Sequence, residues 1–225
     1  MSHYEQLLRE TSAQREAFLT IPIIRGALEN GVDRALYLAY LGEAYHHVKH
    51  TCPLLALAVA RCRKGDDPLR EALLAYISEE RGHDEWILDD IAALGGDVAA
   101  IRAAQGGPAV RIMVGYAYFA VEWISPYTLL GMVHVLEGIS AMIALRAARS
   151  IRSRIGESRG KGFSYLESHG SLDQEHVKFF EVLVNRVEAP ETRDMIVDSA
   201  KIMYRLFGAV FKDLELRFGS NKDAA

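Results

Sequence analysis

The chain has 225 residues, of which half are hydrophobic and a quarter are charged. This length is typical of one globular domain, and we expect a single domain over residues 1–225 with a frayed tail at 220–225. The net charge of −4 gives no electrostatic reason to expect binding to nucleic acid or to an anionic membrane.

Targeting and redox signals are weak throughout the sequence. The first residues are polar and lack the apolar core of a signal peptide. The most apolar window, residues 116–132, is interrupted by Glu122 and Pro126, so we predict no membrane span. Cys52 and Cys62 lie ten apart on one predicted helix and are not placed for a disulfide. We therefore expect a cytoplasmic protein.

Apolar residues recur every three to four positions along the whole chain, Ala and Leu are frequent, and Pro and Gly are sparse inside segments. This pattern predicts an all-α bundle of seven to eight helices. Asp33 and Asp67 are candidate N-caps, Pro53 should kink its helix, and Gly156 is a candidate helix end. The predicted helices cover residues 3–19, 22–30, 33–63, 67–95, 108–124, 127–155, 160–187 and 191–218.

The helix predicted over 33–63 carries Glu43, His46, His47 and His50. The apolar stripe of this helix excludes Glu43, His46 and His50, and only His47 approaches its edge. Two interpretations stay open for this face: a polar or interface surface, or a surface that contacts a substrate.

The helix predicted over 67–95 places a carboxylate and a histidine on its apolar stripe. Glu80 projects into the stripe and His83 to its edge, whereas Glu79 projects outside it. The Glu-x-x-His spacing is used by di-iron carboxylate sites in helical bundles, although such pairs also arise by chance. Asp84 also projects inward and could orient a ligand histidine.

The helix predicted over 127–155 contains one isolated acid. Glu137 is the only acid between Glu122 and Glu157. An ionised carboxylate on an apolar helix is costly unless it is paired or binds a metal, so Glu137 is either half of a buried salt bridge or a metal ligand. Glu122 is similarly isolated, because no other acid lies between Asp97 and Glu137.

Three potential metal ligands, His169, Asp173 and His176, follow at positions i, i+4 and i+7. At about 100° per residue they fall within an arc of roughly 60° on one helix face. Imidazole and carboxylate donors suit iron or manganese, and the absence of thiolate disfavours structural zinc. Each motif alone is weak evidence, and their conjunction on three helices predicts a two-metal site.

These residues resemble the heme-oxygenase-like di-iron oxidases and oxygenases, in the superfamily that also holds the TenA thiaminases and PqqC. The resemblance runs from about Tyr37 to Phe180. It rests on three stretches: residues 44–55, residues 79–95, and Leu136-Glu137-Gly138 with residues 169–176. The family's six ligands occur in the order Glu, His, Glu, His, Asp/Glu, His. By this resemblance the metal ligands are Glu80, His83, Glu137, His169, Asp173 and His176.

The resemblance also implies a fold, an activity and a pocket. It implies a heme-oxygenase-like bundle, two iron ions per chain, O2 as co-substrate, and a small organic substrate such as a fatty acid or an amino acid. A homodimer and an external electron donor are further expectations, with no nucleic-acid or membrane partner. Glu122 would then be a pocket residue, Asp84 and His47 would lie near the site, and an apolar wall would cover the pocket. The wall would consist of Tyr116, Tyr118, Phe119, Glu122 and Trp123.

Four alternatives remain beside this interpretation. A TenA-like thiaminase or a salvage or binding protein would need no metal, and a PqqC-like oxidase would use O2 without one. A heme oxygenase could use His47, which would leave Glu80, Glu137 and Asp173 unexplained. A ferritin-like bundle could use Glu43 as an extra ligand, but Glu43 projects away from its helix's apolar stripe and His169 would be surplus.

Overall fold

The computed structural model describes residues 1–157 and 161–219. For residues 169–175 it describes the backbone and not the side chains. Every regular element in the described part is helical. A π-helical turn (Ala120–Ile124) and a 3₁₀ turn (Pro126–Thr128) join α9 to α10. The α-helices are α1 (His3–Glu10), α2 (Ser12–Leu19), α3 (Pro22–Asn30), α4 (Arg34–Val48), α5 (Thr51–Arg61), α6 (Asp67–Glu80), α7 (His83–Ala93), α8 (Val98–Ala103), α9 (Pro108–Phe119), α10 (Leu129–Ile155), α11 (Ser164–Asn185) and α12 (Pro190–Gly219).

The helix expected over 33–63 is two helices, because Pro53 ends the first one rather than kinking a continuous one. A proline has no N–H to donate four residues back, and its ring clashes with that carbonyl, here Lys49. The chain accordingly leaves the helix at Lys49 and His50, and α5 begins at Thr51. This break separates α4 from α5, with His47 near the end of α4 and Thr51 at the start of α5.

The helix expected over 67–95 is also interrupted, at Arg81 and Gly82. Gly82 has φ +93°, a left-handed conformation that favours glycine. Glu80 is therefore the last residue of α6, and His83 is the first residue of α7. The Glu-x-x-His pair spans a helix junction instead of one continuous face.

Helix termini follow the sequence signals in part. The Asp33 side chain accepts a hydrogen bond from the Leu36 N–H at 2.9 Å and caps α4 as expected. Asp67 is not a cap, because α6 begins at this residue and its carboxylate pairs with Arg70. Gly156 follows the last residue of α10 with φ +74°, as expected for a helix end.

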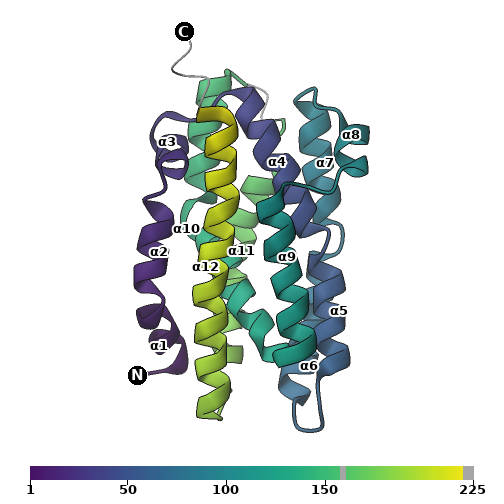
Figure 1. The fold of residues 1–225 in the computed structure, drawn as a ribbon, viewed down its shortest axis with the longest axis vertical. Coiled ribbons are helices and arrows are strands. Elements are labelled where there is room, and N and C mark those ends of the chain that lie inside the picture. The colour runs from purple at the N-terminus through teal and green to yellow at the C-terminus, as the bar shows by residue number, and fades with distance from the viewer. Residues whose placement is uncertain (158–160, 220–225) are drawn as a thin grey trace.

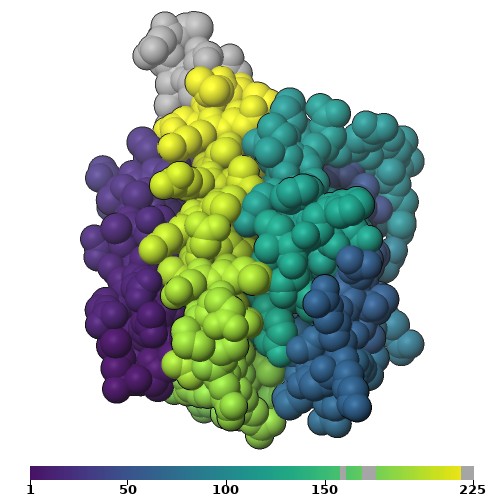
Figure 2. Space-filling view, turned by 60° about the horizontal axis from the view of Figure 1, so that its bottom comes forward, coloured from purple at the N-terminus to yellow at the C-terminus, as the bar shows by residue number. Residues whose placement is uncertain are grey.

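The long helix α10 lies at the centre of the bundle and packs along α11, α12 and α3. Figure 1 shows α12 at the front, between α1–α3 on one side and α9 on the other. Figure 2 shows the same order on the surface of a second view, with α12 between the N-terminal helices and the segment that contains α5 and α9.

One segment of the described part, Pro126–Ile155, is long and apolar enough to cross a membrane by length and composition. This corrects the expectation that no window reaches that threshold. The physical reason is its central position in the bundle: half of its apolar window is buried inside the fold, and a core helix passes the same test.

The buried side chains form two apolar clusters. The first contains Tyr76 and Val135, and the second contains Ile87 and Ala144. Along α10 the first cluster extends past Glu137 to Ile139, and the second begins at Ala144. Helix α6 contributes to the first cluster and α7 to the second, so Glu80, at the junction of these two helices, lies where the two parts of the core meet.

Candidate metal centre

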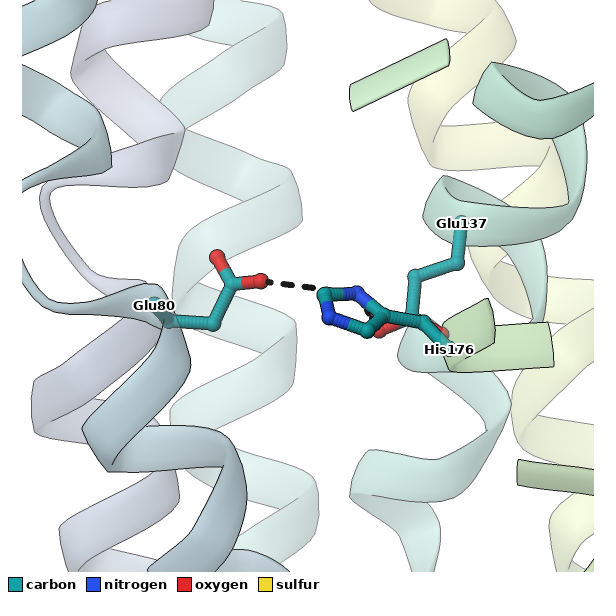
Figure 3. Close-up of side chains that lie close together, drawn as sticks. All are labelled: Glu80, Glu137 and His176. Atoms are coloured by element: carbon teal, nitrogen blue, oxygen red, sulfur yellow. Dashed lines mark ion pairs between the residues drawn. The ribbon is translucent and has the colours of Figure 1, made fainter. Parts of the chain in front are cut away.

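Three ligand-type side chains from three helices converge near the junction of α6 and α7. Glu80 ends α6, Glu137 lies in α10 and His176 lies in α11, and one ligand atom from each falls within 4.8 Å of the others (Figure 3). The His176 Nδ1 atom is 3.7 Å from Glu137 Oε1 and 4.0 Å from Glu80 Oε1. Two carboxylates that face each other at this separation repel unless a cation or a proton lies between them. The donor set and its burial therefore fit a transition-metal ion such as iron or manganese.

Glu79 orients His176 from the outside of this cluster. Its Oε2 atom lies 3.1 Å from His176 Nε2, while its side chain is 53% exposed. Because an ionised carboxylate only accepts hydrogen bonds, His176 donates through Nε2–H to Glu79, and Nδ1 of a neutral ring would be the atom that could bind a cation beside Glu80 and Glu137. This is the carboxylate–histidine arrangement that positions metal ligands. The structure thus separates the two acids: Glu80 faces the cluster, and Glu79 holds the histidine.

His83 contacts the other oxygen of Glu80. Its Nδ1 atom lies 3.0 Å from Glu80 Oε2, and its ring stacks on Trp86 with centroids 4.1 Å apart. The ring is buried, so its orientation is fixed by packing. The Glu80 carboxylate consequently lies between His83 and His176.

Tyr76 fixes the second carboxylate. Its hydroxyl donates to Glu137 Oε2 at 3.4 Å, and its ring packs edge-on against His176. Burial, and after it the Glu137 carboxylate, raises the pKa of Tyr76 far above its usual value. The hydroxyl therefore stays protonated and acts as a donor to Glu137 at any physiological pH.

Two of the expected ligands, His169 and Asp173, lie in α11 but outside the side chains that the structure describes. Of the expected neighbours, Asp84 is half-buried in the first turn of α7. His47 is buried, and its ring packs at 5.9 Å from Phe207.

The polar face expected on the helix over 33–63 is instead buried, and this expectation is corrected. Glu43 accepts hydrogen bonds from the Gly107 N–H at 2.9 Å and from Arg217 at 2.7 Å. His46 is buried as well, and His50 lies 3.1 Å from the Tyr118 hydroxyl. The reason is that α4 packs against α7 on one side and against α9 and α12 on the other, so it has no single buried stripe. Glu43 is thus a structural ion pair.

The apolar wall expected around Tyr116–Trp123 does not line the main cavity. Trp123 and Phe119 are 76% and 53% exposed, and Glu122 lies 3.5 Å from Arg61 on the surface. With Tyr118 they border a separate shallow depression against α5. The inward face of α9 is taken by small and aliphatic residues such as Met113 and Ala117, which leaves the aromatic residues on the outer side.

The main cavity has a volume of about 180 Å³, and the acidic cluster forms part of its wall. It lies between α3, α4, α10 and α12, with contributions from α5, α6 and α11. Glu80 and Glu137 are part of its lining, together with Tyr76 and His47. A small molecule in this cavity would reach the atoms that converge on the candidate metal position. The sequence pattern does not predict this location, because each helix contributes only a few residues to it.

Comparison with known proteins identifies the family and the fold. A family model described as an iron-containing redox enzyme matches residues 38–208, and the chain belongs to this family. None of the curated proteins compared with the chain matches it.

Solved structures share the heme-oxygenase-like fold. A domain of unknown function from Shewanella denitrificans OS217 has a TM-score of 0.87 at 22% identity, covering 99% of this chain and 96% of that one. A TenA homologue from Pseudomonas syringae pv. tomato has a TM-score of 0.79 at 13% identity, covering 94% and 92%. The heme oxygenase from Leptospira interrogans has a TM-score of 0.76 at 16% identity, covering 95% and 100%. The expected heme-oxygenase-like, all-α fold is confirmed.

Proposed function

We propose that this chain is an O2-consuming oxidase or oxygenase that uses a non-heme iron centre to oxidise a small organic molecule. Glu80, Glu137 and His176 would hold the first iron. By the family resemblance, His83, His169 and Asp173 would complete a second position. Iron bound there would supply electrons to O2 and direct the oxidation of a nearby C–H, C–C or N–H bond.

The observation that carries the proposal is the convergence of two largely buried carboxylates and one oriented imidazole on the wall of a cavity. Glu79 orients the His176 ring, and Tyr76 restrains Glu137, so the ligand atoms would be ordered before a metal binds. The cavity then holds the substrate against these atoms and excludes water from them.

A TenA-like activity that depends on a cysteine nucleophile finds less support. Neither cysteine is among the described residues that line the main cavity. Burial raises the pKa of both the Cys52 and the Cys62 thiol, which disfavours the reactive thiolate. A heme-dependent activity would use His47 on the cavity wall and would leave the convergent carboxylates without a role.

The test is anaerobic reconstitution with Fe(II), followed by iron quantification and exposure to O2. We expect about two iron ions per chain and consumption of O2 that depends on them. His176→Ala should lose at least one of these ions, whereas His134→Gln, a change at a buried histidine of α10 outside the candidate site, should bind iron as the unaltered protein does.

Two results would overturn the proposal. One is iron binding at well under one equivalent per chain. The other is unchanged iron binding in His176→Ala. Adding hemin to the metal-free protein tests the heme alternative. A tight complex with a Soret band that disappears in His47→Ala would favour heme chemistry instead.

A further inference from the structure

Tyr37, Tyr40 and Tyr76 all line the main cavity, but their hydroxyls differ in what they contact. The Tyr76 hydroxyl donates to Glu137, and the Tyr37 hydroxyl donates to the Gly162 carbonyl at 3.0 Å. Among the residues that the structure describes, no group donates to or accepts from the Tyr40 hydroxyl. Because a phenol can both donate and accept a hydrogen bond, Tyr40 keeps this capacity for a molecule in the cavity.

Tyr40 lies inside the protein and not on its outer surface. Its ring is nearly parallel to the Tyr37 ring, with centroids 6.3 Å apart, and the Phe211 ring of α12 lies at 5.8 Å. Burial alone raises the pKa of Tyr40 well above its usual value. The side chain nevertheless keeps some accessible surface, as expected when the accessible part faces an internal cavity. The hydroxyl is therefore protonated and can donate into the cavity.

Tyr40 and the acidic cluster lie in different parts of the cavity. Tyr76, which contacts Glu137, belongs to the first apolar cluster, whereas Tyr37 belongs to the second and Tyr40 packs against it. The cavity is lined by residues of both clusters, and along α10 its lining extends from Glu137 to Ile151, about 21 Å of helix. One bound molecule could therefore contact the acids with one group and Tyr40 with another.

Apolar surface separates these two polar places. On α4, Tyr40 lies two turns before His47, which is about 10 Å along the helix axis. Phe207 and Phe211, one turn apart on α12, pack against His47 at 5.9 Å and against Tyr40 at 5.8 Å. Both phenylalanines line the cavity, as does Ile143 of α10. The lining between Tyr40 and the acids thus favours a hydrocarbon part of a ligand.

The charges of the lining restrict the group that Tyr40 can bind. Among the residues that the structure describes, Glu80 and Glu137 are the acids of the lining, and no lysine or arginine is part of it. A carboxylate or phosphate group beside Tyr40 would be buried without a cation, which is costly. A neutral oxygen or nitrogen atom accepts from the hydroxyl without that cost.

We propose that Tyr40 is a specificity-determining residue, which donates a hydrogen bond to a neutral acceptor on a molecule whose other polar group lies at Glu80 and Glu137. The ligand is thus bifunctional, with two polar groups separated by an apolar part, and the group at Tyr40 is a hydroxyl, a carbonyl or a similar uncharged acceptor. The contact at the two acids rests on the proposed function, because a metal ion would receive that group. The hydrogen bond at Tyr40 does not rest on it.

The test compares linear diols with a hydroxyl at each end, from butanediol to decanediol, with the 1-alkanols in which a methyl group replaces one hydroxyl. Calorimetry measures the binding of both series to the full-length metal-free protein and to Tyr40→Phe. For the diol that reaches from the acids to Tyr40, the substitution should lower the ratio of diol affinity to alkanol affinity by about 3–10-fold, the effect of one neutral hydrogen bond. For shorter diols this ratio should not change.

Tyr37→Phe is the matched control, because it removes the same atom from the neighbouring ring. The Tyr37 hydroxyl already donates to the Gly162 carbonyl, so its loss should lower the thermal unfolding temperature and leave the affinity ratio unchanged. Tyr40→Phe should give the opposite pattern. Its unfolding temperature should not fall, because the fold supplies no partner to its hydroxyl within the part of the chain that the structure describes.

The proposal is overturned if Tyr40→Phe leaves the affinity ratio unchanged at every length, or if neither series binds. It is also overturned if Tyr40→Phe lowers the unfolding temperature as much as Tyr37→Phe does, because the hydroxyl would then have a partner within the fold. Failure of the proposed function has a different signature, in which a protein that binds no iron keeps the preference for a diol that depends on Tyr40. Iron binding without that preference would refute the role of Tyr40 alone.

Discussion

Glu43 and the pair Glu80 and Glu137 are acids inside the bundle that differ in the charge of their partners. Glu43 accepts from a backbone N–H and from the guanidinium of Arg217, so its charge is compensated within the fold. Glu80 and Glu137 face each other and share a histidine. The first arrangement stabilises a helix junction, and the second is suited to take up a cation. Burial of an acid therefore does not identify a functional site, whereas the nature of its partners does.

Among the substitutions that test this comparison, Glu137→Gln should have the largest effect on Fe(II) affinity. The amide keeps the shape and can still accept from Tyr76, but it removes one of the two converging charges. Affinity for Fe(II) should fall by about 100-fold or more, because even partners outside the metal's own ligands are worth 10–100-fold. Anaerobic metal titration measures the loss, and thermal unfolding of the metal-free variant should show no decrease in stability. A large loss of stability would mean that Glu137 is structural.

Glu79→Gln should have the next largest effect. The amide can hydrogen-bond to His176 but no longer enforces the Nε2–H form, so Fe(II) affinity should fall by about 10–100-fold. Because Glu79 is half-exposed, the stability of the metal-free protein should change by less than about 0.5 kcal/mol. Metal titration at several pH values measures the change, and Glu85→Gln, at an exposed acid paired with Arg102, is the control. Equal affinities in the two variants would contradict the orienting role.

Glu43→Gln tests the other half of the comparison and should give the opposite pattern. It removes a charged hydrogen bond to Arg217 inside the bundle, so the free energy of unfolding should fall by about 1–3 kcal/mol. Fe(II) affinity should not change. Chemical denaturation measures the loss, and Glu122→Gln, which breaks a surface pair with Arg61, should cost less than about 1 kcal/mol. A metal-binding defect in Glu43→Gln would support a ferritin-like ligand set instead.

A third buried polar group, His134, should give the smallest effect and only in acid. Burial lowers the pKa of His134 from 6.5 to about 4, and its Nε2 lies 3.2 Å from the Thr11 hydroxyl. Between these two pKa values the unfolded chain binds a proton that the folded chain does not, so stability falls as the pH falls from 6.5 toward 4.

His134→Gln removes this proton uptake and should therefore lose stability less steeply in acid. Between about pH 6.5 and about pH 5, the difference between the two proteins should reach about 2 kcal/mol. Denaturation at both pH values measures it, and comparison with the unaltered protein cancels the contribution of the acidic residues. Parallel pH dependences would show that His134 is already protonated in the folded state.

Isolation of an acid on an apolar helix singled out one residue of the candidate site. Glu137 stood out because no other acid lies near it in the chain, and the structure places it in the cluster. The face of Glu43 was predicted wrongly, because projection onto a single stripe assumes that a helix is buried on one side only. Helix α4 is buried on every side from Leu41 to His47.

The sequence alone determined the all-α class, the approximate helix positions and the carboxylate and histidine residues of a candidate metal site, because these depend on helical periodicity and on the cost of burying charge. The tertiary structure decided two further features. It separated Glu79 from Glu80, because Glu80 faces the other ligand-type side chains while Glu79 contacts His176 from outside. It placed the cavity between α3, α4, α10 and α12 rather than beside α9. A sequence pattern describes the faces of one helix, whereas a cavity exists only where the faces of several helices fail to meet.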